Sequence, residues 1–280
     1  MNRRHFILAG AAFFLAGAPG APGFAAEPFE PTRFSVEIVG RGPDVILIPG
    51  LTAGRGTWRS TAGAVTGYRY HLLQVAGFAG APARGNARGA ILSPLADEII
   101  RYIEDRRLRR PAIVGHSMGG TLAMMIAARR PGLLGRIMVV DMLPQPAGLL
   151  GQNAEAIGPL ANSLGNFFAT PGGRRLFGGL MNAFSPPNSA NRNSDPDVVG
   201  RAMRELATLD LAPRLGRIRA PFTVVYASPD ERAADALDRA FRDAYASVRS
   251  ARLVRIDGSG HMIMFDQPAR FRDAVRGFLR

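Results

Sequence analysis

The chain has 280 residues, with 35 basic and 22 acidic side chains and a formal net charge of +13 at pH 7. Hydrophobic residues make up 47% and charged residues 20%, which is typical of a folded globular protein with a sizeable core and not of a disordered or collagen-like chain. Because cysteine is absent, disulfides, thiolate metal sites and a cysteine nucleophile are excluded.

The basic residues are arginines without exception, since no lysine occurs in the sequence. They are spread along the chain, whereas a protein that binds nucleic acid usually gathers its basic residues on one face. We therefore expect no nucleic-acid partner. A basic protein that binds nucleic acid or a membrane surface is kept as an alternative, to be recognised by salt-dependent binding.

Residues 1–26 have the layout of a secretory signal, with a positive start, an apolar middle and small residues at the end. Arg3 and Arg4 resemble the paired arginines of a twin-arginine signal. The apolar run is too short and too rich in alanine and glycine for a confident membrane-spanning helix. We expect cleavage after residue 25 or 26, a periplasmic or secreted mature protein, and no stable membrane span after cleavage.

From there on, short apolar runs alternate with amphipathic segments. The runs predicted to form strands are residues 33–39, 44–48, 70–76, 112–114, 137–140, 222–226 and 252–256. The segments predicted to form helices are residues 92–106, 121–130, 230–246 and 268–279. Such alternation predicts an α/β fold with a doubly wound, mostly parallel sheet.

Residues 142–213 interrupt this alternation, because they are rich in Pro, Gly and Asn and contain no strand pattern. Short amphipathic patterns at 157–168, 173–184 and 198–209 predict a helical lid inserted between two late strands. The core would then consist of residues 27–141 and 214–280. An insertion at this point would sit over the sheet edge at which such folds bind ligands.

The strongest local signal is Gly115-His116-Ser117-Met118-Gly119, which follows a buried strand and opens a helix. A serine on so tight a strand-to-helix turn has strained dihedral angles, and the two glycines let the backbone pass closely. The turn lifts the hydroxyl to the top of the sheet, and the helix N-terminus favours developing negative charge. Ser117 is therefore the predicted nucleophile.

A serine nucleophile needs a base, and imidazole is the usual one. The chain has four histidines. His5 leaves with the signal, His71 lies in a predicted strand, and the side chain of His116 is expected to point away from its serine neighbour. Elimination leaves His261, in the loop after the last predicted strand.

The base needs a carboxylate that fixes its tautomer. Asp230 follows the strand predicted at residues 222–226 and is the preferred candidate. Asp141 directly follows the strand at 137–140 and is the alternative acid. Both lie at the carboxyl edge of the expected sheet.

The motif around Ser117, the chain order of serine, acid and His261, and Pro49-Gly50 eight residues before Trp58 resemble the lid-bearing branch of the α/β-hydrolase fold superfamily. The resemblance covers residues 33–280. It implies an oxyanion hole formed by the backbone amides of Leu51 and Met118. A serine at position 117 argues against the haloalkane dehalogenase and epoxide hydrolase branches, whose nucleophile is a carboxylate.

Two features depart from the family pattern. Pro49 stands where relatives often have a histidine, which keeps the backbone donor but changes what orients the loop. The acid that usually precedes Gly77 is missing, which makes the entrance less polar.

The expected function is hydrolysis of a carboxylic ester or lactone through an acyl-enzyme, with no metal or organic cofactor. The same residues could instead run cofactor-free perhydrolysis or carbon–carbon bond hydrolysis. An alternative of another class is a non-catalytic binding protein that keeps the hydrolase fold.

Overall fold

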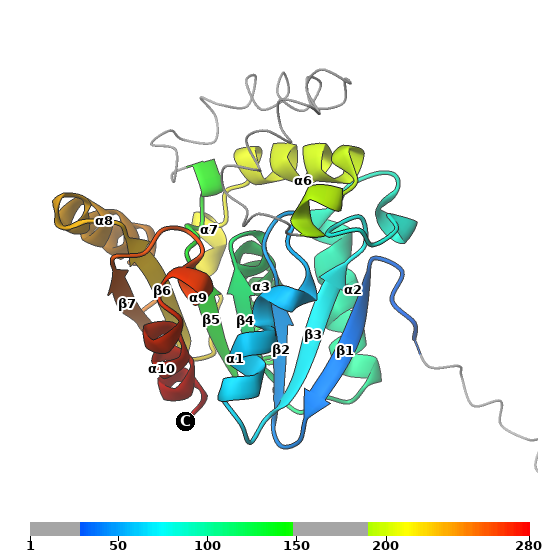
Figure 1. Ribbon diagram of the computed structural model, residues 1–280, viewed down its shortest axis with the longest axis horizontal. Coiled ribbons are helices and arrows are strands. Elements are labelled where there is room, and N and C mark those ends of the chain that lie inside the picture. Colours follow the sequence, from blue (N-terminus) through cyan, green and yellow to red (C-terminus); the bar gives the residue numbers. More distant parts are fainter. Residues whose placement is uncertain (1–28, 148–189) are drawn as a thin grey trace, which may run out of the picture.

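The computed structural model describes residues 29–147 and 190–280 (Figure 1). The predicted signal at residues 1–26 and the expected helices at 157–168 and 173–184 lie outside the described residues. Within the described ranges, no helix is long and apolar enough to cross a membrane.

A seven-stranded sheet forms the centre of the molecule, with the spatial order β1-β3-β2-β4-β5-β6-β7. Only β1 is antiparallel to its neighbour, and the other pairs are parallel, which confirms the predicted doubly wound sheet. The strands are β1 (Phe34–Gly40), β2 (Asp44–Ile48), β3 (Arg69–Val75), β4 (Ala112–His116), β5 (Arg136–Val140), β6 (Phe222–Ser228) and β7 (Ala251–Asp257).

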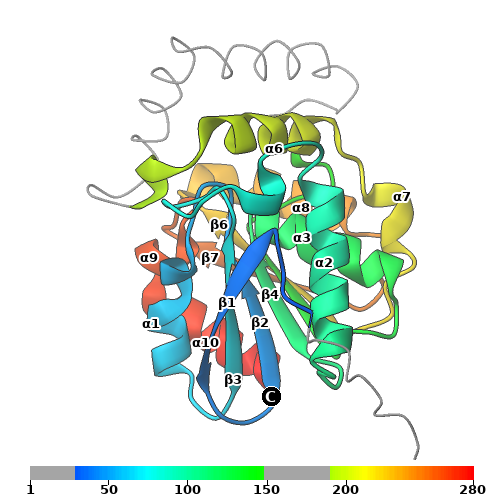
Figure 2. The same cartoon turned by 90° about the vertical axis from the view of Figure 1, so that its right-hand side faces the viewer.

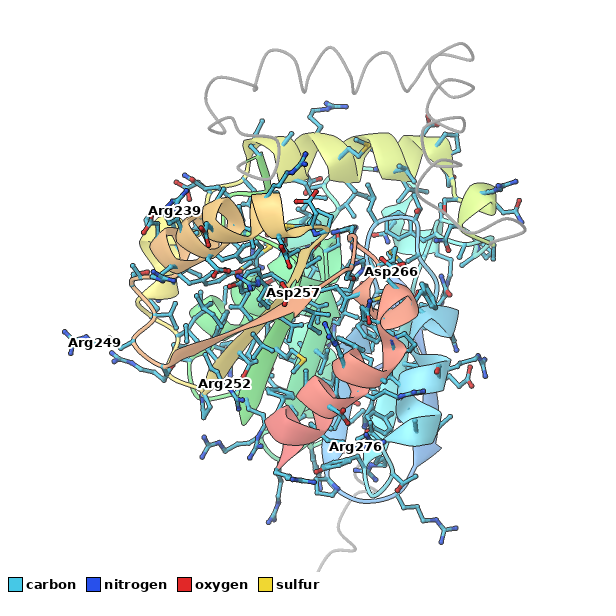
Figure 3. All side chains as sticks on the ribbon, turned by 60° about the vertical axis from the view of Figure 1, so that its left-hand side comes forward. Arg239, Arg249, Arg252, Asp257, Asp266 and Arg276 are labelled. Atoms are coloured by element: carbon cyan, nitrogen blue, oxygen red, sulfur yellow. The ribbon has the colours of Figure 1, made fainter. Side chains whose placement is uncertain are left out.

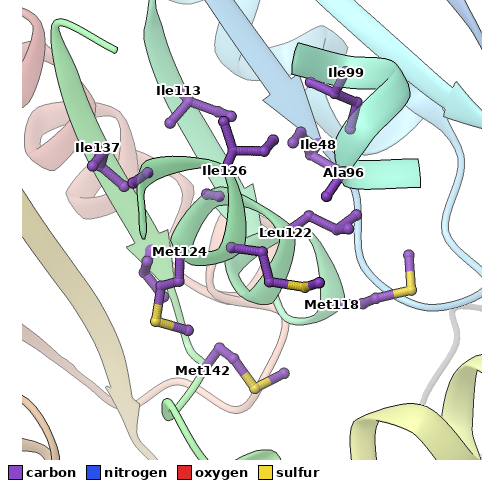
Figure 4. Packing of buried hydrophobic residues seen from close by; sticks show 14 of the residues in the cluster. Ile48, Ala96, Ile99, Ile113, Met118, Leu122, Met124, Ile126, Ile137 and Met142 are labelled. Atoms are coloured by element: carbon purple, nitrogen blue, oxygen red, sulfur yellow. The ribbon is translucent and has the colours of Figure 1, made fainter. Parts of the chain in front are cut away.

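Helices cover both faces of the sheet (Figure 2). One face carries α2 (Leu92–Asp105), α3 (Met118–Arg129) and α8 (Glu231–Ala244), and the other carries α1 (Arg59–Ala64) and α10 (Pro268–Leu279). Helix α3 has buried side chains all round except at its last residue, as expected of a helix enclosed by the core. Figure 4 shows Met118, Leu122 and Ile126 of α3 packed among side chains of β4 and α2.

The described part of the segment between β5 and β6 contains the 3₁₀ turn η4 (Ala190–Asn193), α6 (Pro196–Thr208) and α7 (Ala212–Leu215). Helix α6 matches the helix expected at residues 198–209 and runs above the sheet in Figures 1 and 2. The carboxylate of Glu205 accepts hydrogen bonds from the amides of Ile91 (2.7 Å) and Leu92 (2.9 Å) at the start of α2.

The remaining short elements are η1 (Arg55–Trp58), η2 (Arg84–Asn86) and α9 (Ile263–Asp266). Arginines lie over the surface, and Figure 3 shows Arg239, Arg249 and Arg252 on or beside α8 and the edge strand β7. Several arginines on the surface pair with carboxylates, for example Arg255 with Asp238 at 2.8 Å. Exposed pairs of this kind contribute little to stability.

Candidate active site

The residues singled out in the sequence gather at one edge of the sheet, because parallel strands end together there. Ser117 directly follows β4, Asp141 directly follows β5, and His261 lies four residues beyond the end of β7. Since β4 and β5 are neighbours in the sheet, Ser117 and Asp141 occupy adjacent strand ends. His261 comes from the loop that leads from β7 to α9, two strands away from β5.

Ser117 has backbone angles of φ 53° and ψ −121°, a conformation that a residue with a side chain rarely adopts. Its amide donates to the carbonyl of Val140 at 2.9 Å, and its carbonyl accepts from the amide of Gly120 at 2.8 Å. The flanking glycines are required by close approach. A Cβ on Gly115 would lie 2.1 Å from the Gly119 carbonyl oxygen, and one on Gly119 would lie 2.3 Å from that of Ile48.

His261 is paired with Asp141 at 2.7 Å between Nδ1 and Oδ2. The second carboxylate oxygen of Asp141 accepts from the amide of Ala227 at 2.9 Å. The carboxylate is therefore fixed from both sides and is nearly buried, with a side-chain exposure of 11% against 42% for His261. Because a carboxylate accepts the hydrogen bond, Nδ1 of His261 carries the proton and Nε2 is left bare as a proton acceptor.

In the structure the alternative candidate, Asp141, is the aspartate that pairs with His261, whereas Asp230 was the preferred candidate. Asp230 lies beyond Ser228 and Pro229, at the exposed start of α8, and its backbone carbonyl accepts from the Ser228 hydroxyl at 2.9 Å. Strand β6 runs two residues further than predicted, to Ser228, so that Asp230 is carried outward. Asp141 is the residue directly after β5 and has a positive φ of 50°.

The two amides expected to form an oxyanion hole lie beside Ser117. Met118 is the first residue of α3, and Leu51 belongs to a turn closed by the Ala53 amide and the Gly50 carbonyl at 3.2 Å. Within the described residues, neither the Leu51 nor the Met118 amide donates to a protein acceptor. Such unpaired donors are what a developing oxyanion requires.

A second histidine lies against the first. The rings of His116 and His261 have centroids 4.6 Å apart, and Nε2 of His116 is 2.9 Å from the backbone carbonyl oxygen of His261. His116 is only 2% exposed. Burial and the neighbouring His261 lower the pKa of His116 to about 3. No pattern or spacing in the sequence indicates that His116 contacts His261.

A cavity of about 240 Å³ opens beside the loop that follows β2. It is lined by residues from the loop after β2, from β3, from η4 and from α9, namely Gly54, Gly56, Thr57, Gln74, Ala79, Ala190, Asn191 and Phe265. The described residues hold no group of three or more His, Asp or Glu side chains suited to bind a metal ion.

Known proteins resemble this chain in sequence and in fold. A family model described as "Alpha/beta hydrolase family" matches residues 45–274. A pimeloyl-[acyl-carrier protein] methyl ester esterase from Aeromonas hydrophila is 24% identical over 266 residues, which cover 88% of this chain and 98% of the relative. A second esterase of that name, from Aromatoleum aromaticum, is 25% identical over 261 residues and is covered to 99%.

Solved structures share the fold at lower identity. A thermophilic esterase from Thermogutta terrifontis superposes with a TM-score of 0.71 at 18% identity, covering 88% of this chain and 93% of the other. The enol-lactonase from Burkholderia xenovorans superposes with a TM-score of 0.63 at 17% identity, covering 88% and 96%. At such identities the likeness shows the fold alone.

Proposed function

Since the chain belongs to the alpha/beta hydrolase family, whose relatives include esterases, we propose that it hydrolyses carboxylic esters or lactones with Ser117 as the nucleophile. In this proposal His261 is the general base and Asp141 the acid that orients it. The amides of Leu51 and Met118 form the oxyanion hole.

The observation that carries the proposal is the 2.7 Å pair between His261 and Asp141, beside a serine held in a strained turn. The pair leaves the Nε2 lone pair of His261 ready to accept a proton. The carboxylate also stabilises the imidazolium that forms when the proton arrives.

The mechanism has two steps. In the first, Ser117 Oγ attacks the carbonyl carbon and its proton passes to Nε2 of His261. The bond to the leaving alkoxide breaks, and the alkoxide takes that proton and departs as an alcohol. In the second, His261 takes a proton from water and the hydroxide attacks the acyl carbon. The bond between that carbon and Ser117 Oγ breaks, and the proton returns from His261 to Oγ. The products are a carboxylic acid and an alcohol, or one hydroxy acid from a lactone.

The relatives act, by their names, on a methyl ester and on lactones. Methyl and ethyl esters and small lactones are therefore the substrates to try first.

Export is part of the same proposal, because residues 1–26 have the layout of a signal peptide. The enzyme would then act on esters outside the cytoplasm, with the segment between β5 and β6 as its lid. N-terminal sequencing of the protein from the periplasm tests the export. A mature end at residue 26 or 27 is expected, and an intact Met1 on protein that stays in the cytoplasm would contradict it.

The catalytic proposal is tested by a panel of methyl, ethyl and longer-chain esters and lactones, assayed with the wild-type chain and Ser117→Ala. We expect turnover that falls by about 10⁴–10⁶-fold in the variant, because the covalent intermediate can no longer form. Turnover that survives the substitution in well-folded protein would overturn the assignment of Ser117.

A further inference from the structure

The imidazole of His116 lies between two parts of the candidate active site. On one side its ring is 4.6 Å from the ring of His261, at an interplanar angle of 45°. On the other side it faces Gly50, in the turn that carries the Leu51 amide, because a Cβ built on Gly50 would lie only 2.9 Å from Nδ1 and 3.3 Å from Cε1. Any larger residue at position 50 would therefore displace this ring.

The two nitrogens of His116 have different environments. Nε2 lies 2.9 Å from the carbonyl oxygen of His261, which can only accept, so Nε2 carries the proton and donates it. Nδ1 is then a bare acceptor, and it is buried without a hydrogen-bond partner in the described part of the chain. An unsatisfied buried acceptor is costly, and a fold seldom keeps one without a reason.

The charge state of His116 follows from the same surroundings. The ring is 2% exposed, and burial together with the nearby His261 lowers its pKa to about 3. His116 therefore stays neutral while the adjacent base gains and loses a proton. Among the described residues, carboxylates near that base are Asp141, on its Nδ1, and Asp266 of α9, whose carboxylate accepts from the amide of Gly260 at 2.9 Å.

From this arrangement we propose that His116 is a positioning residue for His261, which it tethers through the hydrogen bond from Nε2–H to the His261 carbonyl. The inference rests on the function proposed for His261 and deepens it. Strand β4, which ends at His116 directly before Ser117, thereby also holds the loop that carries the base, although His116 and His261 are 145 positions apart. Without the tether, only Asp141 and the loop itself would fix where the imidazole sits relative to Ser117.

The test uses a matched pair of substitutions in the full chain. In His116→Gln the side-chain amide nitrogen takes the place of Nε2 and can still donate to the His261 carbonyl. In His116→Asn the nitrogen takes the place of Nδ1, faces Gly50, and leaves that carbonyl unpaired. His71→Gln is the control, because His71 is also a histidine with 2% exposure but lies at the other edge of the sheet.

We expect kcat of His116→Asn to fall by about 10–100-fold with KM nearly unchanged, because a catalytic group displaced by about 1 Å can cost 10²-fold. His116→Gln should stay within about threefold of wild type, and so should His71→Gln. Equal losses in the Gln and Asn variants of His116, or no loss in either, would overturn the proposal. So would a loss in His71→Gln as large as that in His116→Asn.

A second measurement needs no substrate and separates this proposal from the proposed function. In ¹⁵N-labelled wild-type chain, NMR should show His116 with its proton on Nε2 from pH 8 down to about pH 4.5, well above its pKa of about 3. The far-downfield Nδ1 proton of His261, bonded to Asp141, should persist in His116→Gln and broaden or vanish in His116→Asn. A proton on Nδ1 of His116, or an unchanged downfield signal in His116→Asn, would overturn the tether even in an inactive enzyme. A correct tautomer and tether without Ser117-dependent turnover would instead refute the proposed function.

Discussion

Two buried histidines at opposite ends of the parallel strands differ in how many of their ring nitrogens have a hydrogen-bond partner. His71, near the start of β3, has Nδ1 at 2.7 Å from the hydroxyl of Tyr102 and Nε2 at 2.9 Å from the carboxylate of Asp44. His116, at the end of β4, has one nitrogen tethered to His261 and the other without a partner among the described residues. Both ring nitrogens of His71 therefore have partners, whereas His116 keeps an unsatisfied acceptor beside Ser117, which has a strained backbone.

The difference indicates that the carboxyl ends of the strands, where the candidate active site lies, are less stable than they could be. Strained dihedral angles and unpaired polar atoms persist where the surrounding structure forces them, and they cluster at functional sites. Substitutions at the carboxyl edge should therefore change activity most, and substitutions at the amino edge should change stability alone.

The largest expected effect is that of Asp141→Asn. Without the carboxylate, Nδ1 of His261 loses the partner that fixes its tautomer, and kcat should fall by about 10²–10⁴-fold. Asp230→Asn is the matched control and should stay within about twofold, because Asp230 lies at the exposed start of α8. Steady-state kinetics of both variants decide the matter. A large loss in Asp230→Asn, with Asp141→Asn active, would restore Asp230 as the acid.

Gly119→Ala tests whether the turn around Ser117 is sterically closed. The added methyl group would meet the Ile48 carbonyl oxygen at 2.3 Å and the Pro49 carbonyl oxygen at 2.8 Å, and neither is a flexible side-chain end. We expect a loss of about 1–3 kcal/mol in the free energy of unfolding, measured by urea denaturation, together with lost activity. Gly132→Ala, where the methyl group would meet nothing within 4 Å, is the control. Equal stability of the two variants would show that the turn has room to relax.

The free energy of unfolding should depend on pH through the protonation of His116. Its pKa is about 3 in the folded chain, against 6.5 for an ordinary histidine, so that below pH 6.5 the unfolded chain binds a proton that the folded chain refuses. Above pH 6.5 the ring is neutral in both states and has no effect. Below it, the free energy of unfolding falls by about 1.4 kcal/mol per pH unit as the pH drops towards 3.

His116→Gln should remove that share of the slope when unfolding by urea is measured between pH 6 and 4.5. Burial also lowers the pKa of His71, although its bond to Asp44 opposes this shift. His71→Gln should therefore flatten the slope less than His116→Gln does. An unchanged slope in His116→Gln would mean that the buried ring accepts a proton in the folded chain.

The smallest expected effect belongs to Asp44→Asn at the amino edge. The substitution weakens the bonds of Asp44 to His71 and to Arg69, at 2.9 and 3.0 Å, and should cost about 1 kcal/mol of stability. Activity towards the best ester should stay unchanged, because the site lies at the other edge of the sheet. A thermal melt and one kinetic assay suffice. A tenfold loss of kcat would break the separation of the two edges.

The fold could be predicted from the sequence because its strands are short, continuous apolar runs closed by turn residues. The run at residues 44–48 became β2 without a shift at either end, and the helix expected from residue 121 begins at Met118. Helix α1 was missed because the segment Arg59–Ala64 has no apolar periodicity, and its one buried side chain is that of Thr61.

The sequence could not indicate which aspartate pairs with His261, because the pairing depends on the length of β6 and on strand order. Both Asp141 and Asp230 follow predicted strands, and local pattern does not say that two further strand residues carry Asp230 to the surface. The contact between His116 and His261 depends likewise on a loop that crosses back over two strands. Such juxtapositions are properties of the packed sheet, and no local spacing encodes them.

Labelling with a fluorophosphonate probe tests whether Ser117 is activated, because the probe reacts with an activated serine without requiring the natural substrate. Wild-type chain, Ser117→Ala, Asp141→Asn and Asp230→Asn would be labelled side by side and the adduct located by peptide mass. We predict an adduct on Ser117 that is absent in Ser117→Ala, forms much more slowly in Asp141→Asn, and forms at the wild-type rate in Asp230→Asn. An adduct on another residue, or none on well-folded wild-type chain, would contradict a catalytic site built from Ser117, His261 and Asp141.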